Sequence, residues 1–166
     1  MKFSIITVCL NSEKTIEFTL NSIMTQTHKN LEHIIVDGGS SDKTIEIINK
    51  YPFKNKKIIL LKKTGIYESI NTGIKSANGN IIGVLHSNDI FQSIKTIENI
   101  NKSFSKTDKS IVLTNVVFFK GENFKEITRY YTARSFRPWM LKFGLMPPHT
   151  GAFIKKTAYK KIGLYS

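Results

Sequence analysis

The sequence has a single cysteine, Cys9, among its 166 residues, so no disulfide can form within the chain. One cysteine fits a reducing compartment, and we expect a cytoplasmic protein. No apolar run approaches the roughly 18 residues that a membrane-spanning helix needs. The first residues lack the basic segment, long apolar core and small-residue cleavage site of a signal peptide. The sequence therefore predicts neither a membrane span nor a secretion signal.

Several catalytic and cofactor motifs are also missing. No G-x-G-x-x-G follows a strand-like run and no G-x-x-x-x-G-K-[ST] occurs, which argues against a dinucleotide enzyme or a P-loop NTPase. No serine stands in a G-x-S-x-G elbow. The four histidines, His28, His33, His86 and His149, do not have zinc-ligand spacing. We expect His33 to be a core or edge residue and His86 to face a site, and His149 is the tentative catalytic candidate.

Acidic residues are few, with 12 against 25 basic residues and a net charge of +13. Residues 91–166 hold 14 lysines and arginines but only 4 acids, whereas residues 1–90 hold 11 and 8. This asymmetry suggests an anionic partner: a nucleic acid, a membrane surface or a phosphorylated substrate. The alternative is a lysine-rich composition with solvated side chains. Because the charge is spread out and no nucleic-acid-reading motif occurs, we expect no nucleic-acid partner.

The hydrophobic content of 40% is enough for a packed core. Strand-like apolar runs alternate with helical patterns, which predicts βαβ units and an α/β fold with a mostly parallel sheet. The expected strands are 2–10, 31–36, 58–61 and the run that starts at Ile81. Four helices are expected. The first follows a cap at Asn11–Ser12, the second follows Asp42, and the other two cover 66–77 and 92–104.

The pattern changes after about residue 108. Two strand-like runs, 110–120 and 124–132, are joined by Gly121-Glu122-Asn123 and predict a hairpin. We expect a basic and aromatic segment of irregular structure at 134–145 and a proline-rich turn at 147–151. A short strand at 152–154 and a short helix at 156–162 are expected to follow. We therefore expect a single domain made of two parts, 1–108 and 109–166.

Two aspartates stand at the ends of expected strands, where parallel sheets bind ligands. Asp89 follows the run that starts at Ile81, and its carboxylate suits a divalent cation such as Mg²⁺. The alternative is that Asp89 caps the next helix. Asp37 precedes the Gly38-Gly39 turn and can accept a hydrogen bond from a ligand such as a nucleobase, or it only forms the turn. We favour a functional Asp37 and a helix-capping Asp42.

Six stretches match a known family, and they follow that family's order across nearly the whole chain. The chain resembles the family 2 glycosyltransferases of the GT-A fold, especially the bacterial members that build surface polysaccharides. The stretches are SIITVCLN (4–11), SIMTQT (22–27), LEHIIVDGGSSDKT (31–44), GIYESINTGI (65–74), GNIIGVLHSND (79–89) and, more weakly, HTGAFIKK (149–156) with KIGLY (161–165).

The resemblance implies a nucleotide-diphosphate sugar as donor, a glycan or lipid-linked acceptor, and Mg²⁺ or Mn²⁺ as cofactor. It implies an inverting, metal-dependent transfer in cell-surface polysaccharide or lipopolysaccharide biosynthesis, at the inner face of the cell membrane. Asp89 would be the metal ligand, and Asn88 would share its Asp-x-Asp-type position. The other implied donor-binding residues are Thr7, Val8 and Leu10 in the nucleotide pocket, Asp37 at the base, and Tyr67 and Asn71 facing the donor.

The chain departs from the family pattern at two points. Asn88 stands where many relatives have an acid, although an asparagine can still hydrogen-bond a ribose. The expected catalytic base lies beyond Ser166, so the resemblance indicates a C-terminally truncated chain. In these terms, 1–108 is the nucleotide-sugar-binding part and 109–166 begins the acceptor-side region. The alternative function is a non-catalytic nucleotide-sugar-binding remnant.

Residues 129–161 hold eight basic residues and no acid, interleaved with aromatic rings. Lysines beside aromatic rings suit the headgroup level of an anionic membrane, so we predict a peripheral membrane contact there. The alternative is that the rings are core and the charges are merely solvated.

Overall fold

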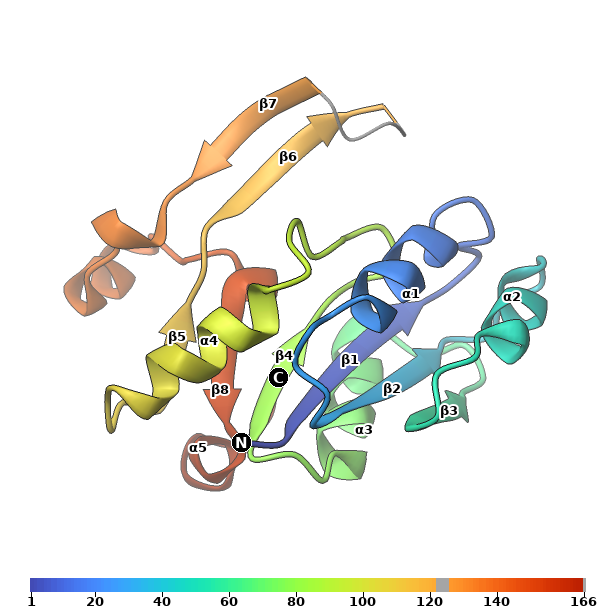
Figure 1. The fold of residues 1–166 in the computed structure, drawn as a ribbon, viewed down its shortest axis with the longest axis horizontal. Coiled ribbons are helices and arrows are strands. Elements are labelled where there is room, and N and C mark those ends of the chain that lie inside the picture. Colours follow the sequence, from blue (N-terminus) through green and yellow to red (C-terminus); the bar gives the residue numbers. More distant parts are fainter. Residues whose placement is uncertain (122–125, 166) are drawn as a thin grey trace.

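The computed structural model describes residues 1–121 and 126–165. A main sheet lies between two layers of helices, and a separate two-stranded sheet stands beside it (Figure 1). The sheet has six strands in the order β3-β2-β1-β4-β8-β5. Their bounds are β1 (Phe3–Cys9), β2 (Leu31–Asp37), β3 (Lys56–Leu60), β4 (Ile81–Val84), β5 (Ile111–Leu113) and β8 (Ala152–Lys155). Strands β1 to β4 are parallel to one another, so the predicted α/β fold with a mostly parallel sheet is confirmed.

The helices cover both faces of this sheet. Helices α1 (Ile16–Met24), α2 (Thr44–Lys50) and α4 (Thr96–Ser105) pack on one face, and α3 (Ile66–Ser76) and α5 (Lys156–Ile162) pack on the other. Every residue of β1 and β2 is buried, as expected for strands covered on both faces. Helix α3 lies close to β1 at Gly73, where a Cβ atom would lie 2.5 Å from the Ile6 side chain. A residue with a side chain at Gly73 would push this helix away from the strand.

Strand β8 is antiparallel to both of its neighbours, β4 and β5. It pairs antiparallel with β4, with Gly83 opposite Phe153 and Ile81 opposite Lys155. The residues just before β8, the 3₁₀ turn η3 (His149–Gly151), therefore lie beside the carboxyl end of β4. This reversal brings a late segment of the chain to the edge where the first parallel strands end.

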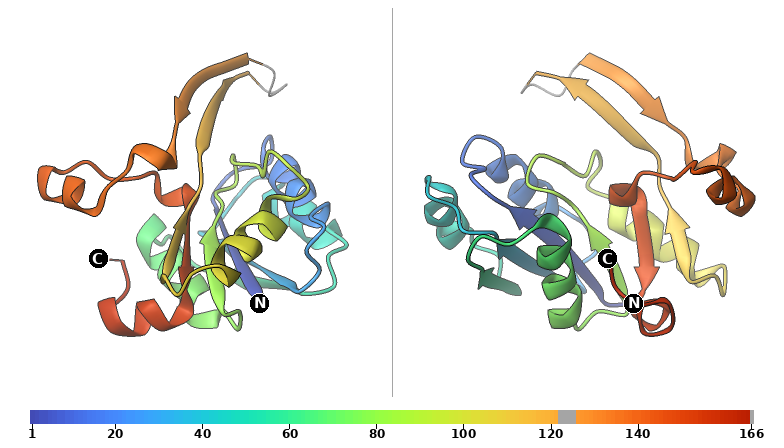
Figure 2. Two further views of the ribbon diagram at one scale, coloured as in Figure 1. Left: turned by 60° about the vertical axis from the view of Figure 1, so that its left-hand side comes forward. Right: turned by 180° about the vertical axis from the view of Figure 1, so that it is seen from behind.

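The hairpin is present but shorter than predicted. The run 110–120 divides into β5, which joins the main sheet, and β6 (Val116–Lys120), which pairs with β7 (Glu126–Tyr131). Of the predicted turn, Glu122 and Asn123 lie outside the described residues. The hairpin stands away from the sheet, and the 3₁₀ turns η1 (Ala133–Ser135) and η2 (Pro138–Phe143) follow it (Figures 1 and 2).

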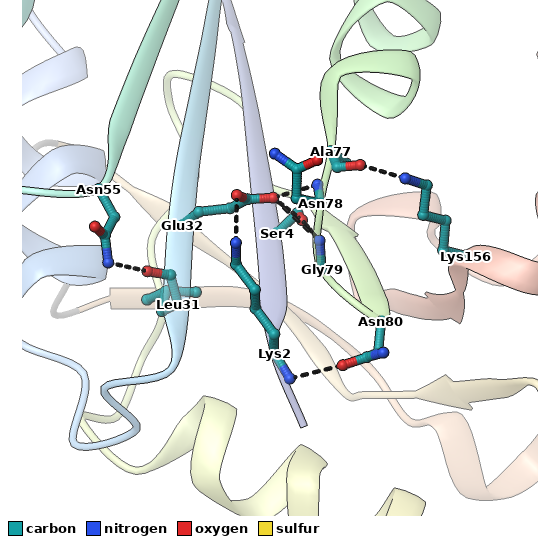
Figure 3. Close-up of polar contacts among 10 residues, drawn as sticks. All are labelled: Lys2, Ser4, Leu31, Glu32, Asn55, Ala77, Asn78, Gly79, Asn80 and Lys156. Atoms are coloured by element: carbon teal, nitrogen blue, oxygen red, sulfur yellow. Dashed lines mark hydrogen bonds and ion pairs between the residues drawn. The ribbon is translucent and has the colours of Figure 1, made fainter.

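The buried carboxylate of Glu32 joins three segments by hydrogen bonds at the amino end of the sheet (Figure 3). Glu32 on β2 accepts hydrogen bonds from the Ser4 hydroxyl at 2.5 Å and from the backbone N–H groups of Asn78 and Gly79 at 2.5 and 3.1 Å. The Lys2 ammonium lies 3.0 Å from its other oxygen. Glu32 thus ties β1 and β2 to the turn that enters β4, at the end of the sheet opposite the candidate site.

Candidate functional site

Three loops that follow β1, β2 and β4 are joined by hydrogen bonds at the carboxyl edge of the sheet. The backbone N–H of Asn11 donates to the Ser40 hydroxyl at 2.8 Å, and the N–H of Ser41 donates to the Asn11 side chain at 2.9 Å. The Ser12 and Ser87 hydroxyls lie 2.8 Å apart. The predicted helix cap at Asn11–Ser12 is wrong, because α1 begins only at Ile16 and these side chains hold neighbouring loops together instead.

Asp37 ends β2 and is almost fully buried. Its carboxylate accepts hydrogen bonds from the backbone N–H groups of Gly39 and Ser40 at 2.9 and 2.8 Å, and also from the Ser40 hydroxyl. The Cys9 thiol lies 3.5 Å from it. With 2% of its surface exposed, Asp37 shapes the turn that it begins. A direct hydrogen bond from Asp37 to a nucleobase stays a prediction.

Asp42 lies two positions before Thr44, where α2 begins. Its carboxylate accepts the backbone N–H of Thr44, the first residue of the helix, at 3.0 Å. It also accepts the N–H of Glu13 at 3.1 Å. Asp42 therefore joins the beginning of α2 to the β1 loop, one position before Lys43, which is the N-cap residue of the helix.

A cleft of about 740 Å³ opens between the β4 loop, the β6–β7 hairpin and η3. Its polar residues come mainly from the β4 loop and η3, and aromatic side chains from α1 and the hairpin contribute apolar walls. The polar group includes His86, Asn88, Asp89 and His149, and the walls include Phe18, Phe118, Phe119 and Tyr131. Small-molecule sites commonly combine apolar walls with a few convergent polar groups.

Asp89 lies on this cleft and does not cap a helix. Helix α4 begins at Thr96, seven positions further along, so the alternative role at its N-terminus is excluded. The Asp89 backbone is fixed instead, with its N–H donating to the His86 carbonyl at 3.0 Å and its carbonyl accepting the Thr19 hydroxyl at 2.8 Å. Burial raises the pKa of its carboxyl, while a backbone hydrogen bond from His86 and the charge of His149 oppose that shift.

His86 and His149 meet at the cleft, with their Nε2 atoms 2.8 Å apart and their rings inclined at 76°. Burial and the neighbouring His149 lower the pKa of His86 to about 4, so this imidazole is neutral at pH 7. Sequence reasoning selected each histidine separately but not the pair. The contact depends on the antiparallel direction of β8, which the short run 152–154 does not encode.

The three donor-binding candidates of the first strand have different environments. Thr7 has no exposed surface, and its hydroxyl lies 2.9 Å from Nε2 of His33, which is buried as predicted. Val8 is 9% exposed and packs on the α3 side of the sheet. Leu10 follows the strand and is 54% exposed. Only Leu10 offers a large side-chain surface to a ligand, and Thr7 offers none.

Tyr67 and Asn71, the candidates on α3, both contact Tyr165. The Asn71 amide donates to the Tyr165 carbonyl at 2.7 Å and accepts the Tyr165 N–H at 3.0 Å. The rings of Tyr67 and Tyr165 are stacked, with centroids 6.1 Å apart and planes at 5°. Tyr67 is still 53% exposed. Sequence reasoning did not identify Tyr165 as a partner, because the two segments are 94 positions apart.

A divalent cation would find few protein ligands preassembled. Within residues 1–121 and 126–165, no three His, Cys, Asp or Glu side chains are grouped closely enough to hold a metal ion. Mg²⁺ and similar ions often take one or two protein ligands and complete their coordination with substrate phosphates and water. The cleft residues fit coordination by one or two protein ligands that is completed by substrate phosphates and water.

The basic and aromatic segment is partly surface and partly core. Tyr159 is 8% exposed and packs in the core, whereas Trp139, Phe143 and Met146 are 59, 73 and 75% exposed. We call residues 134–146, with their exposed apolar side chains and Arg134, Arg137 and Lys142, the outer segment. It projects from the body of the protein (Figure 2). In the part of the chain that the structure describes, no helix is long and apolar enough to cross a membrane.

Comparison with known proteins gives a consistent match. Residues 4–163 fit the family model described as Glycosyl transferase family 2. The chain is 36% identical over 124 residues to the Escherichia coli UDP-Glc:alpha-D-GlcNAc-diphosphoundecaprenol beta-1,3-glucosyltransferase WfaP, covering 73% of this chain and 45% of that protein. It is 29% identical over 126 residues to a PGL/p-HBAD biosynthesis glycosyltransferase of Mycobacterium tuberculosis, covering 74% and 49%. The chain thus spans about half the length of these curated relatives.

Solved structures share the fold. S. aureus TarS residues 1–349 in complex with UDP-GlcNAc superposes with a TM-score of 0.76 at 24% identity, covering 97% of this chain and 47% of that one. The mannosyltransferase PcManGT from Pyrobaculum calidifontis, in complex with GDP-Man and Mn²⁺, superposes with a TM-score of 0.73 at 17% identity, covering 99% and 47%.

Proposed function

Because this chain belongs to glycosyl transferase family 2, with the predicted GT-A fold, we propose that it binds a nucleotide-diphosphate sugar for sugar transfer. The acceptor would be a glycan or a lipid-linked saccharide in cell-surface polysaccharide biosynthesis, at the cytoplasmic face of the membrane. The observation that carries this proposal is the convergence of three joined loops beside a cleft at the carboxyl edge of the sheet. Open α/β sheets bind their ligands at that edge.

The donor would lie over the loops after β1, β2 and β4. Leu10 presents an exposed apolar side chain beside the nucleotide, and Asn88 presents an exposed amide to a ribose hydroxyl. Asp37 would contribute by fixing the turn whose backbone borders the base. The exposed ring of Tyr67 would border the donor while it stacks on Tyr165.

The acceptor would enter the cleft between the hairpin and the β4 loop. Aromatic and apolar walls there suit the apolar faces of sugar rings, and the polar residues at the β4 loop can bind hydroxyl groups. The name of the WfaP relative specifies a sugar carried on diphosphoundecaprenol, which supports a lipid-linked acceptor for this chain.

A Mg²⁺ or Mn²⁺ ion would be held by Asp89 and by oxygens of the donor diphosphate. Such an ion neutralises the diphosphate as the sugar–phosphate bond breaks. Asp89 is the only acid among the described residues that line the cleft, so none of them is a second carboxylate that can act as a base. This favours nucleotide-sugar binding without turnover as the second candidate function. For sugar transfer itself, His149 is the proposed catalytic group.

The decisive test is a calorimetric titration of this chain with UDP-glucose, UDP-GlcNAc and GDP-mannose, each with and without Mn²⁺. We expect saturable binding of one donor that becomes tighter with Mn²⁺, because the cation bridges the protein and the diphosphate. Absence of binding to all three donors, together with salt-sensitive binding to a single-stranded oligonucleotide, would contradict the proposal. Release of UDP or GDP in the presence of acceptor would distinguish an enzyme from a binding protein.

The outer segment would contact the membrane that carries a lipid-linked acceptor. Its exposed rings match the headgroup level of a bilayer, and its three basic residues match anionic lipid. Each basic residue near such a surface contributes about 1 kcal/mol, and salt screens this attraction.

We expect the chain to sediment with anionic vesicles at low salt, to be released at high salt, and not to bind vesicles of neutral lipid. The double variant Trp139→Ser/Phe143→Ser should lose most of this binding. A control variant, Leu60→Ser, removes a side chain that is 63% exposed on β3, outside the outer segment, and should bind as the parent chain does. Equal recovery with neutral and anionic vesicles would show that the charges do not act as proposed.

A further inference from the structure

A second cavity, of about 490 Å³, lies between the end of the hairpin and the outer segment. Its size is in the range of sites that hold a small organic ligand. Most of its lining is apolar, and we call it the apolar pocket. The apolar side chains come from β5, from the outer segment and from the prolines that follow it, and they include Leu113, Phe136, Met140, Leu145 and Pro147. Such a lining suits a hydrocarbon chain, because contact with it removes apolar surface from water.

The apolar pocket adjoins the cleft beside the β4 loop. Thr114, Tyr131, Met146 and Pro148 line both cavities. The hairpin forms a wall of each, so a long ligand that lies along the hairpin can occupy the two cavities together. One end of such a ligand would meet the polar residues of the cleft, and the other end would meet apolar side chains alone.

Arg129 stands where the two cavities meet. It carries the only charge among the described residues that line the apolar pocket. Its guanidinium carbon lies 4.4 Å from the centroid of the Tyr131 ring, which borders both cavities. Phe118, opposite Arg129 in the hairpin, lines the cleft. Within residues 1–121 and 126–165, no carboxylate pairs with Arg129.

This combination of one cation and an apolar pocket has a specific chemical match. A guanidinium presents a fork of N–H donors that binds two oxygens of a phosphate group. A free phosphate would leave the apolar walls in contact with water, and an uncharged glycan would leave Arg129 without a partner. A phosphate or diphosphate at the end of a hydrocarbon chain satisfies both features.

We infer that Arg129 and the apolar pocket bind the lipid carrier of a lipid-linked acceptor. The hydrocarbon chain would occupy the pocket, the phosphate group would contact Arg129, and the attached saccharide would extend into the cleft beside the β4 loop. The assignment of the cleft to the acceptor rests on the proposed function. Because the outer segment forms one wall of the pocket, the chain would enter next to the surface that we propose to contact the membrane.

The test uses farnesyl diphosphate, a soluble probe with a short hydrocarbon chain and a diphosphate. It is titrated into the chain by calorimetry in the presence of EDTA, so that no cation can join its diphosphate to Asp89. Inorganic diphosphate and farnesol are titrated in parallel. We expect farnesyl diphosphate to bind at least about tenfold more tightly than either, because burial of the chain and hydrogen bonds to a charged group both contribute. UDP should not displace it.

Two variants separate the contributions of charge and pocket. Arg129→Gln should weaken farnesyl diphosphate binding at least about tenfold and leave farnesol binding unchanged, and this exposed position should tolerate the substitution. Leu145→Asp, at a side chain that is 53% exposed, places a carboxylate in the pocket and should weaken the binding of both lipids. Lys120→Gln is the matched control, because Lys120 is an exposed cation of the same hairpin that lines neither cavity.

Three results would each overturn the inference: no binding of farnesyl diphosphate, equally tight binding of inorganic diphosphate, or an Arg129→Gln variant that binds farnesyl diphosphate as the parent chain does. Displacement by UDP would also overturn it, because the probe would then occupy the donor site. Binding of UDP-sugars with Mn²⁺ is measured on the same proteins. If donor binding persists while farnesyl diphosphate fails to bind, the proposed function stands and only the lipid site falls.

Discussion

Asp89→Asn should abolish the metal-dependent part of nucleotide-sugar binding, so that the variant binds donor equally with and without Mn²⁺. The substitution keeps the size of the side chain and removes its charge. A carboxylate that is largely buried interacts strongly with a nearby cation, because little water screens it. We expect a loss of at least about tenfold in the Mn²⁺-dependent affinity, equivalent to about 1.4 kcal/mol.

Asp108→Asn provides the control for this experiment. Asp108 is exposed in the segment between α4 and β5, outside the cleft, and its substitution removes the same charge from the chain. Its donor affinity should match that of the parent chain under both conditions. If Asp89→Asn retains the full Mn²⁺ effect, Asp89 is not a ligand, and the cation is held by other groups.

The central part of the fold could be predicted because its signals are local. The apolar runs of β1, β2 and β4 are covered on both faces, and turn residues separate them from amphipathic helices, so the alternation was visible in the sequence. The division of 110–120 was not visible. Ile111 to Leu113 and Val116 to Lys120 are both apolar runs that contain β-branched residues, yet the first pairs with β8 and the second with β7.

The candidate site could be predicted only in part, because a motif gives the position of a residue but not the direction of its side chain. Asp89 lies on the cleft as its place after β4 indicated. Asp37 also stands at the end of its strand, but its carboxylate turns back onto the N–H groups of Gly39 and Ser40. The pairing of His86 with His149 needed the strand direction of β8, which only long-range packing determines.

Stability at neutral pH should depend strongly on Glu32, at the opposite end of the sheet from the site. Burial alone would raise the pKa of this carboxyl, but hydrogen bonds from Ser4 and Asn78 and the charge of Lys2 outweigh it, and the net pKa is lowered. A pKa lower in the folded than in the unfolded chain means that ionised Glu32 stabilises the fold above its unfolded pKa. This contribution is lost as the pH falls through the folded-state value.

Glu32→Gln should therefore lower the free energy of unfolding by about 2–3 kcal/mol at pH 7, the scale for losing hydrogen bonds to a buried charged group. The glutamine can still accept the N–H of Gly79, but its amide group then faces the Lys2 ammonium, donor against donor. Urea denaturation at pH 7 and at about pH 3 measures the effect, and the two chains should converge in acid. Glu46→Gln, which alters an exposed pair with Lys50 on α2, should change stability little. If the difference in the free energy of unfolding between the parent chain and Glu32→Gln persists at low pH, the shape of the side chain and not its charge stabilises this end of the sheet.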